Sequence, residues 1–169
     1  DPSKLLLPLA FNYVKIDDYC GAIRFYKEYL DSNPTDTMTL FYLSICFNNC
    51  SLTEGNASFA DSAMVAYRQL LQLDPTYVDA LIGGGRYFIM QARHYSDSAA
   101  FYRDQEKIDV AAQFDIKRDA MFDSARAYYK IAFDVYPDNV DVAEQYGFTS
   151  ALLHDCPSAV LGFEKVAAA

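Results

Sequence analysis

The sequence predicts an all-α protein built as a stack of antiparallel helix hairpins, with about eight helices in total. Three observations support this fold class. An Ala followed four residues later by an aromatic residue recurs four times, and three of these pairs precede a proline at the same distance. Large and small residues recur at helical spacing ahead of each pair. The chain also has 14 Tyr and 12 Phe, enough to supply much of the packing between helices.

The Ala and its aromatic partner mark the second helix of each predicted hairpin. The pairs are Ala22 and Tyr26, Ala63 and Tyr67, Ala125 and Tyr129, and Ala159 and Phe163, and the prolines are Pro34, Pro75 and Pro137. A small residue lets two helix backbones approach, and the aromatic ring one turn later fills the neighbouring groove. Proline then ends the helix, because it pushes the preceding residue out of helical geometry.

Large and small residues at fixed spacing mark the first helix of each hairpin. The four sets are Leu6, Leu9, Ala10 and Tyr13; Leu40, Leu43, Ser44 and Phe47; Leu81, Gly84, Gly85 and Phe88; and Ala143, Tyr146, Gly147 and Ser150. Leu6 to Leu40 and Ala125 to Ala159 are each 34 residues. The pattern resembles the tetratricopeptide repeat, a 34-residue helix–turn–helix unit. The resemblance implies a right-handed superhelical stack, with one array over residues 1–169 and repeats at about 3–36, 37–77, 78–139 and 140–169.

Two insertions interrupt the repeat period, at about residues 48–58 and 92–122. The first is polar and rich in turn-forming residues, which predicts a long surface loop. The second mixes apolar and charged residues in an amphipathic helical pattern. It predicts that both helices of the third hairpin are extended, project from the stack and are joined near residues 96–98 or 104–109.

Three consecutive glycines, Gly83, Gly84 and Gly85, fall inside a predicted helix, where each costs about 1 kcal/mol relative to alanine. They do not match the GxGxxG or GxxxxGK pattern of phosphate-binding loops, and no strand precedes them. Two explanations remain open. Either a neighbouring helix or aromatic ring approaches closely, or the helix is kinked.

The charge and hydropathy of the chain exclude two classes of partner. A net charge of −9 repels phosphate backbones, so we expect no nucleic-acid partner. No run approaches the roughly 20 apolar residues that span a bilayer, so we expect a soluble protein without direct membrane insertion. Both the cytoplasm and a bacterial periplasm or cell envelope are open, and a similar lengthened hairpin occurs in some bacterial envelope-associated members of the repeat family.

The sequence offers little for catalysis, and we expect no catalytic residues, no cofactor, no metal and no enzyme. The four cysteines, Cys20, Cys46, Cys50 and Cys156, lack CxxC spacing, and only Cys46 and Cys50 could share a helix face or flank one turn. We interpret them as small buried hydrophobic residues rather than disulfide or metal sites. The segment from His154 to Pro157 is interpreted as a capped turn, because adjacent residues do not face one another on a helix.

In a stack of such hairpins, the first helix of each lines the concave face. The predicted partner-binding residues on that face are Leu7, Phe11, Lys15, Phe41, Ile45, Asn49, Ile82, Arg86, Ile89, Glu144 and Phe148. Their apolar character predicts a protein or peptide partner bound as an extended or helical segment. Alternatively, the three phenylalanines of this set are core residues of a tightly wound stack. The Lys/Asn/Arg clamp with which one family subtype holds chaperone tails is absent.

Two functions therefore remain open from the sequence. The first is a non-catalytic protein–protein interaction scaffold with an apolar concave groove. The second is a structural or assembly module that self-associates or forms part of a larger repeat protein.

Overall fold

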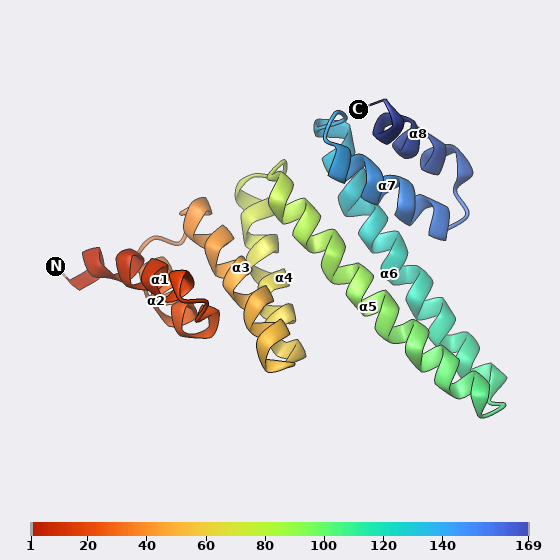
Figure 1. Cartoon of the computed structure of the whole chain (residues 1–169), viewed down its shortest axis with the longest axis horizontal. Coiled ribbons are helices and arrows are strands. Elements are labelled where there is room, and N and C mark those ends of the chain that lie inside the picture. Colours follow the sequence, from red (N-terminus) through yellow and green to blue (C-terminus); the bar gives the residue numbers. More distant parts are fainter. Residues whose placement is uncertain (1, 169) are drawn as a thin grey trace. The chain divides into compact units, whose positions relative to one another are not determined.

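A computed structural model of the chain describes residues 2–168, and within them eight α-helices are paired as consecutive antiparallel hairpins (Figure 1). The helices are α1 (Leu6–Lys15), α2 (Tyr19–Ser32), α3 (Thr37–Glu54), α4 (Ala57–Leu73), α5 (Val78–Asp104), α6 (Ile108–Val135), α7 (Val140–Leu152) and α8 (Cys156–Ala167), after a 3-10 turn, η1 (Pro2–Leu5). The predicted all-α fold of helix hairpins is confirmed, and so is the extended third hairpin, whose helices have 27 and 28 residues.

The chain divides into two compact units, one up to Ala80 and one from Leu81 onward. In the first unit, α2 packs against both α1 and α3, and α3 packs against α4. In the second unit, α7 packs against both α6 and α8. The prediction of a single array over residues 1–169 stays a prediction.

Residues of the repeat pattern form the core of the first unit. Ala22, Tyr26, Ala63 and Tyr67 are all buried there, as the spacing predicts. The core also includes Leu40, Leu43 and Phe47 of α3 and Ala10 of α1. Leu9 differs, because it is 40% exposed.

Acidic and amide side chains begin several helices by accepting a hydrogen bond from a backbone N–H of the first turn. Asp36 caps α3 through Thr39 N (3.1 Å), and Asn139 caps α7 through Val142 N (3.1 Å). This arrangement satisfies amides that have no partner within the helix.

The predicted loop over residues 48–58 is wrong, because α3 continues to Glu54 and α4 begins at Ala57. Polar side chains in this stretch bond back to the helix instead of breaking it: Asn49 Nδ2 donates to Ile45 O (2.9 Å), and Thr53 Oγ1 donates to Asn49 O (3.2 Å). The helix ends at Gly55, whose φ of +62° is the left-handed conformation typical of a C-terminal cap. The insertion therefore lengthens the second hairpin.

The third hairpin extends past the other two helices of its unit, and its helices are joined at residues 105–107 (Figure 1). This position agrees with the second of the two predicted joints. The extended part is held by an aromatic pair across the two helices, since the rings of Tyr102 and Phe114 stack with centroids 5.3 Å apart. Lys117 Nζ lies 5.2 Å from the centroid of the Phe114 ring, and Arg103 forms an ion pair with Asp115.

Two of the three consecutive glycines make room for aromatic rings of α6. A Cβ placed on Gly84 would lie 2.5 Å from Tyr128 Cε1, and one on Gly85 would lie 2.5 Å from Tyr129 Cζ. Helix α5 runs through all three glycines. The close approach of an aromatic ring is thus the correct explanation for Gly84 and Gly85.

Helices α7 and α8 approach one another through a second glycine contact. A Cβ on Gly162 would lie 2.7 Å from Ala143 O and from the Cα and N of Gly147. These are backbone atoms, so the two helices are nearly in main-chain contact there. Phe163, the aromatic residue of the fourth pair, is 42% exposed, whereas the aromatic residues of the other three pairs are buried.

The interpretation of all four cysteines as small buried hydrophobic residues is wrong for three of them and holds for Cys46. Cys20 of α2 and Cys50 of α3 form a disulfide, with their Cα atoms 5.2 Å apart. Cys46 is a fully buried free thiol, and burial raises its pKa to about 12. Cys156 is a free thiol exposed to solvent.

Candidate functional site

The candidate site in the first unit combines two stripes of side chains, one on α1 and one on α3. We call the surface formed by Leu7, Phe11, Lys15, Phe41, Ile45 and Asn49 the α1–α3 face. In each stripe the residues are four apart, so they lie above one another on one side of the helix.

On α1, the apolar side chains of the face change from half-buried to exposed along the helix. Leu7 is half-buried and packs against the core of the first unit. Phe11 is 49% exposed, and Lys15 Nζ lies 4.7 Å from the centroid of its ring. Phe11 is therefore a surface aromatic residue with a neighbouring positive charge, and the alternative of a core position is wrong for it.

On α3, Phe41 is half-buried against the core, and its ring centroid lies 5.7 Å from that of Tyr77. Ile45 and Asn49 are also half-buried, and the Asn49 amide is bonded to the helix backbone. Phe41 thus packs between the α1–α3 face and the core. Its position is closer to the alternative in which the phenylalanines of the set are core residues.

Two further side chains of α3 add exposed apolar area beside this stripe. Met38 is 58% exposed, and Tyr42 is 39% exposed with its ring 6.2 Å from that of Tyr26. Met38 lies three residues before Phe41, and Tyr42 lies three residues before Ile45. The sequence pattern also points Met38 into the predicted groove, but it does not single out Tyr42, because the pattern places residues on a face without giving their depth.

The other predicted binding residues lie on α5 and α7 of the second unit. Ile82 and Ile89 are half-buried, and Arg86 and Glu144 are exposed. Phe148 is 44% exposed, so it is also not a core residue. The Arg86 guanidinium lies near Tyr129, where its charge partly offsets the burial that raises the pKa of that hydroxyl to about 12.

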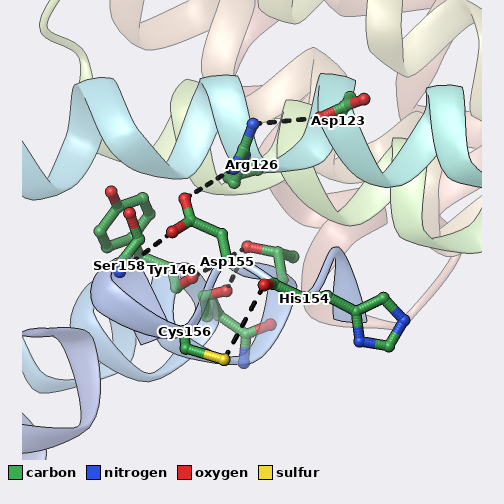
Figure 2. Close-up of polar contacts among 9 residues, drawn as sticks. Asp123, Arg126, Tyr146, His154, Asp155, Cys156 and Ser158 are labelled. Carbon is green, nitrogen blue, oxygen red and sulfur yellow. Dashed lines mark hydrogen bonds and ion pairs between the residues drawn. The ribbon is translucent and has the colours of Figure 1, made fainter. Parts of the chain in front are cut away.

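The segment from His154 to Pro157 is a capped turn, as predicted. His154 has a φ of +60°, and Asp155 caps α8 by accepting a hydrogen bond from Ser158 N (3.3 Å). Figure 2 shows the His154 imidazole pointing away from Asp155 and from the sulfur of Cys156, which contacts the backbone oxygen of His154 (3.8 Å). The three side chains do not converge on a common point.

Arg126 of α6 connects this turn to the long hairpin. Its guanidinium donates to Asp155 Oδ2 (2.9 Å) and to Asp123 Oδ1 (3.1 Å) (Figure 2). Hydrogen bonds from Ser158, followed by the nearby charge of Arg126, lower the pKa of Asp155 below its ordinary value of 3.8. The ionised carboxylate therefore caps the start of α8 and pairs with Arg126 of α6.

We expect the Asp155→Ala variant to be less stable than the parent protein at neutral pH. Because the pKa of Asp155 is lowered on folding, its contribution is present above the ordinary value of 3.8 and is lost as pH falls through the lowered folded value. Thermal melting at a series of pH values checks this: the difference in melting temperature between variant and parent should narrow as the pH falls below 3.8. Asp97→Ala, at an exposed position within α5, is the control. A difference in melting temperature that stays constant down to pH 2 would contradict a stabilising role for the charge of Asp155.

Among residues 2–168, no group of three or more His, Cys, Asp or Glu side chains is placed to share a metal ion. None of the eight helices described above combines the length and apolarity needed to cross a bilayer.

Comparison with solved structures identifies the fold. A thermophilic TPR protein from Thermus thermophilus aligns with a TM-score of 0.60 and 19% identity over 98% of this chain and 73% of its own. MamA from Desulfovibrio magneticus RS-1, residues 41 to the end, has a TM-score of 0.47 and 19% identity over 98% and 93% of the two chains. The human IFIT1 dimer with PPP-AAAA has a TM-score of 0.47 and 15% identity, covering 98% of this chain and 48% of that one.

No family model matches the sequence, and no curated protein matches it. The first of the structural alignments covers almost the whole chain at a TM-score of 0.60, and the paired helices reproduce the hairpins that the repeat spacing predicts. The chain has the helical-repeat fold of tetratricopeptide repeat proteins.

Proposed function

We propose that the chain is a non-catalytic protein-interaction module, and that its first unit holds an apolar or amphipathic segment of a partner protein on the α1–α3 face. The observation that carries this proposal is the exposure of large apolar side chains on this face and beside it. Phe11, Met38 and Tyr42 are 49%, 58% and 39% exposed, beside half-buried Leu7 and Phe41. Removal of such apolar surface from water by a partner is favourable and contributes to the free energy of binding.

The chemistry of the face favours a protein segment over a polyanion. Lys15 is the cation of the six residues that define the face, and it already lies over the Phe11 ring. The chain as a whole carries a net charge of −9, which opposes the approach of a phosphate backbone. An apolar segment with one carboxylate near Lys15 would match both the apolar side chains of the face and its single positive charge.

The fold supports a protein partner in general, without indicating which face binds it. Helical-repeat folds present extended surfaces made of successive helices, and such surfaces suit protein partners. A helix or an extended peptide could place its side chains among those of α1 and α3.

Selection from a displayed library of 16-residue peptides on the immobilised, oxidised protein tests the proposal. We expect selected peptides to carry apolar residues at i and i+3 or i+4, and to bind Phe11→Asp at least about 10-fold more weakly. The physical reason is that the substitution puts a solvated charge in the middle of the covered surface.

Val65→Asp is the matched control, since Val65 is 54% exposed on α4, outside the α1–α3 face. Both variants should keep the helical circular dichroism of the parent. Equal binding by Phe11→Asp and the parent protein would overturn the proposal, and so would a selection without enrichment over a blank surface.

Self-association is the rival function, and a different observation favours it. Val160, Leu161 and Phe163 of α8 are 54%, 48% and 42% exposed, so a second copy could cover them. The mass in solution across a concentration series separates the two functions. A monomer at high micromolar concentration counts against self-association, whereas a dimer that Leu161→Glu dissociates would favour it.

A further inference from the structure

The Cys20–Cys50 disulfide occupies a specific place in the first unit. Helices α2 and α3 run antiparallel and are joined at one end by residues 33–36. Cys20 lies in the first turn of α2, and Cys50 lies near the end of α3, so their bond joins the opposite ends of the two helices. The helix pair is therefore closed covalently at both ends.

Helices α2 and α3 both contribute to the buried core of the first unit, with Ile23 on α2 and Leu43 on α3 among its members. The ring of Tyr26 stacks on that of Tyr42 at 6.2 Å, and Lys27 Nζ lies 5.7 Å from the centroid of the Phe47 ring. A cross-link at this position opposes the separation of α2 from α3.

The position of α1 depends on the same helix pair. Its Tyr13 ring lies 5.2 Å from the Phe25 ring of α2, and Arg24 of α2 donates to the Tyr13 hydroxyl (3.2 Å). Since α2 packs against both α1 and α3, the spacing of α1 and α3 follows from how α2 is held. The α1–α3 face is built from those two helices.

We propose that the Cys20–Cys50 disulfide is a clasp that keeps the α1–α2 hairpin docked on α3, so that the α1–α3 face is complete only in the oxidised protein. As a binding surface, that face rests on the function proposed above; the clasp itself does not. Because such a cross-link persists where thiols are oxidised, the working form belongs to an oxidising compartment.

The neighbouring thiol does not exchange with the clasp. Cys46 is one helical turn before Cys50, fully buried, and its pKa is raised to about 12 by burial. Thiol–disulfide exchange requires a thiolate, and Cys46 stays protonated at neutral pH. The pairing of Cys20 with Cys50 is therefore protected from rearrangement.

Reduction by a dithiol such as dithiothreitol opens the clasp from the outside. The thiolate of the reagent attacks the Cys20 sulfur, because Cys20 is half-buried whereas Cys50 is fully buried. The S–S bond breaks, Cys50 leaves as a thiolate and takes up a proton, and the second thiol of the reagent then releases Cys20. The protein disulfide gains two electrons, and the reagent becomes a cyclic disulfide.

Hydrogen exchange read by mass spectrometry tests the clasp without any ligand. The protein is equilibrated in an oxidising glutathione buffer and compared with the dithiothreitol-reduced protein. We expect protection of α1 and α2 amides to fall by up to about 500-fold on reduction, as a closed loop of this length implies. Amides of α6 to α8 should not change. A Cys20→Ser/Cys50→Ser double variant should behave as the reduced protein, and Cys156→Ser should behave as the oxidised parent.

Thiol counting with a maleimide verifies the state that is compared. In the oxidised protein we expect one reactive thiol when folded, two in denaturant, and four in denaturant after reduction. Four thiols in denaturant before reduction would overturn the pairing. Unchanged protection of α1 and α2 on reduction would overturn the clasp, and so would an equal loss in both units.

The two proposals fail separately. If the exchange pattern appears but no library peptide binds, the clasp stands and the binding function falls. If peptides bind the oxidised and reduced proteins equally while α1 and α2 keep their protection, the binding function stands and the clasp falls.

Discussion

Replacement of Gly162 by alanine is expected to destabilise the second unit by about 3 kcal/mol, at the upper end of the usual cost of overpacking. A Cβ at this position would lie 2.7 Å from Ala143 O and from two backbone atoms of Gly147. Backbone atoms cannot rotate away as a flexible side chain can, so α8 must move off α7. Helix propensity alone predicts the opposite sign, because alanine is favoured over glycine by about 1 kcal/mol.

Thermal unfolding followed by circular dichroism measures this effect, and we expect a fall in Tm of about 10 °C or more. Leu161→Ala is the matched control, because Leu161 is the neighbouring residue on α8 and is 48% exposed. It should change stability by no more than about 0.5 kcal/mol. A Gly162→Ala variant as stable as the control would show that α7 and α8 are not in backbone contact.

The second large effect is expected at Gly85, which lies against the ring of Tyr129. A Cβ there would lie 2.5, 2.6 and 2.8 Å from three atoms of that ring. Tyr129 is fully buried, so the ring has no space into which it can turn. We expect Gly85→Ala to cost about 2 kcal/mol, an overpacking penalty that exceeds the gain in helix propensity.

A double-mutant cycle isolates this contact from the propensity effect. In a Tyr129→Leu background, which removes the ring, Gly85→Ala should be neutral or stabilising. The measurement is the free energy of unfolding of the four proteins in urea. Equal costs of Gly85→Ala in the two backgrounds would contradict the close approach of the ring.

The sequence predicted the hairpins because helix packing requires small and aromatic residues at a spacing that recurs in each hairpin. Ala22 and Tyr26, like Ala125 and Tyr129, are one helical turn apart, and the role of each pair is local to its own hairpin. A small residue and a ring at that spacing are needed wherever two helices approach. The contact between Gly85 of α5 and the Tyr129 ring of α6 likewise pairs a small residue with an aromatic ring.

The disulfide could not be predicted in this way. Cys20 and Cys50 are 30 residues apart, and their pairing depends on the lengths of α2 and α3 and on the turn between them. A loop was expected from residue 48, so Cys50 was not assigned to α3. The alignment of α2 with α3 that brings the two sulfurs together could therefore not be inferred. Within the continued helix, the Asn49 and Thr53 side chains bond to backbone carbonyls, which composition does not reveal.

The helices that carry the candidate face were predictable from the sequence, but the depth of its side chains was not. Helical spacing correctly placed Phe11 and Phe41 on helices α1 and α3 of one unit. It did not show that Phe11 is 49% exposed while Phe41 packs against the core. Depth depends on how closely neighbouring helices approach, which is a property of the packed unit rather than of one helix.

A hydrogen-exchange footprint of a selected peptide on the oxidised protein tests the central claim most directly. The account predicts that the peptide slows exchange in α1 and α3, and that α4 is unchanged. It also predicts that Phe11→Asp removes the footprint while Val65→Asp keeps it. A footprint on α4, or one that survives Phe11→Asp, would contradict binding at the α1–α3 face.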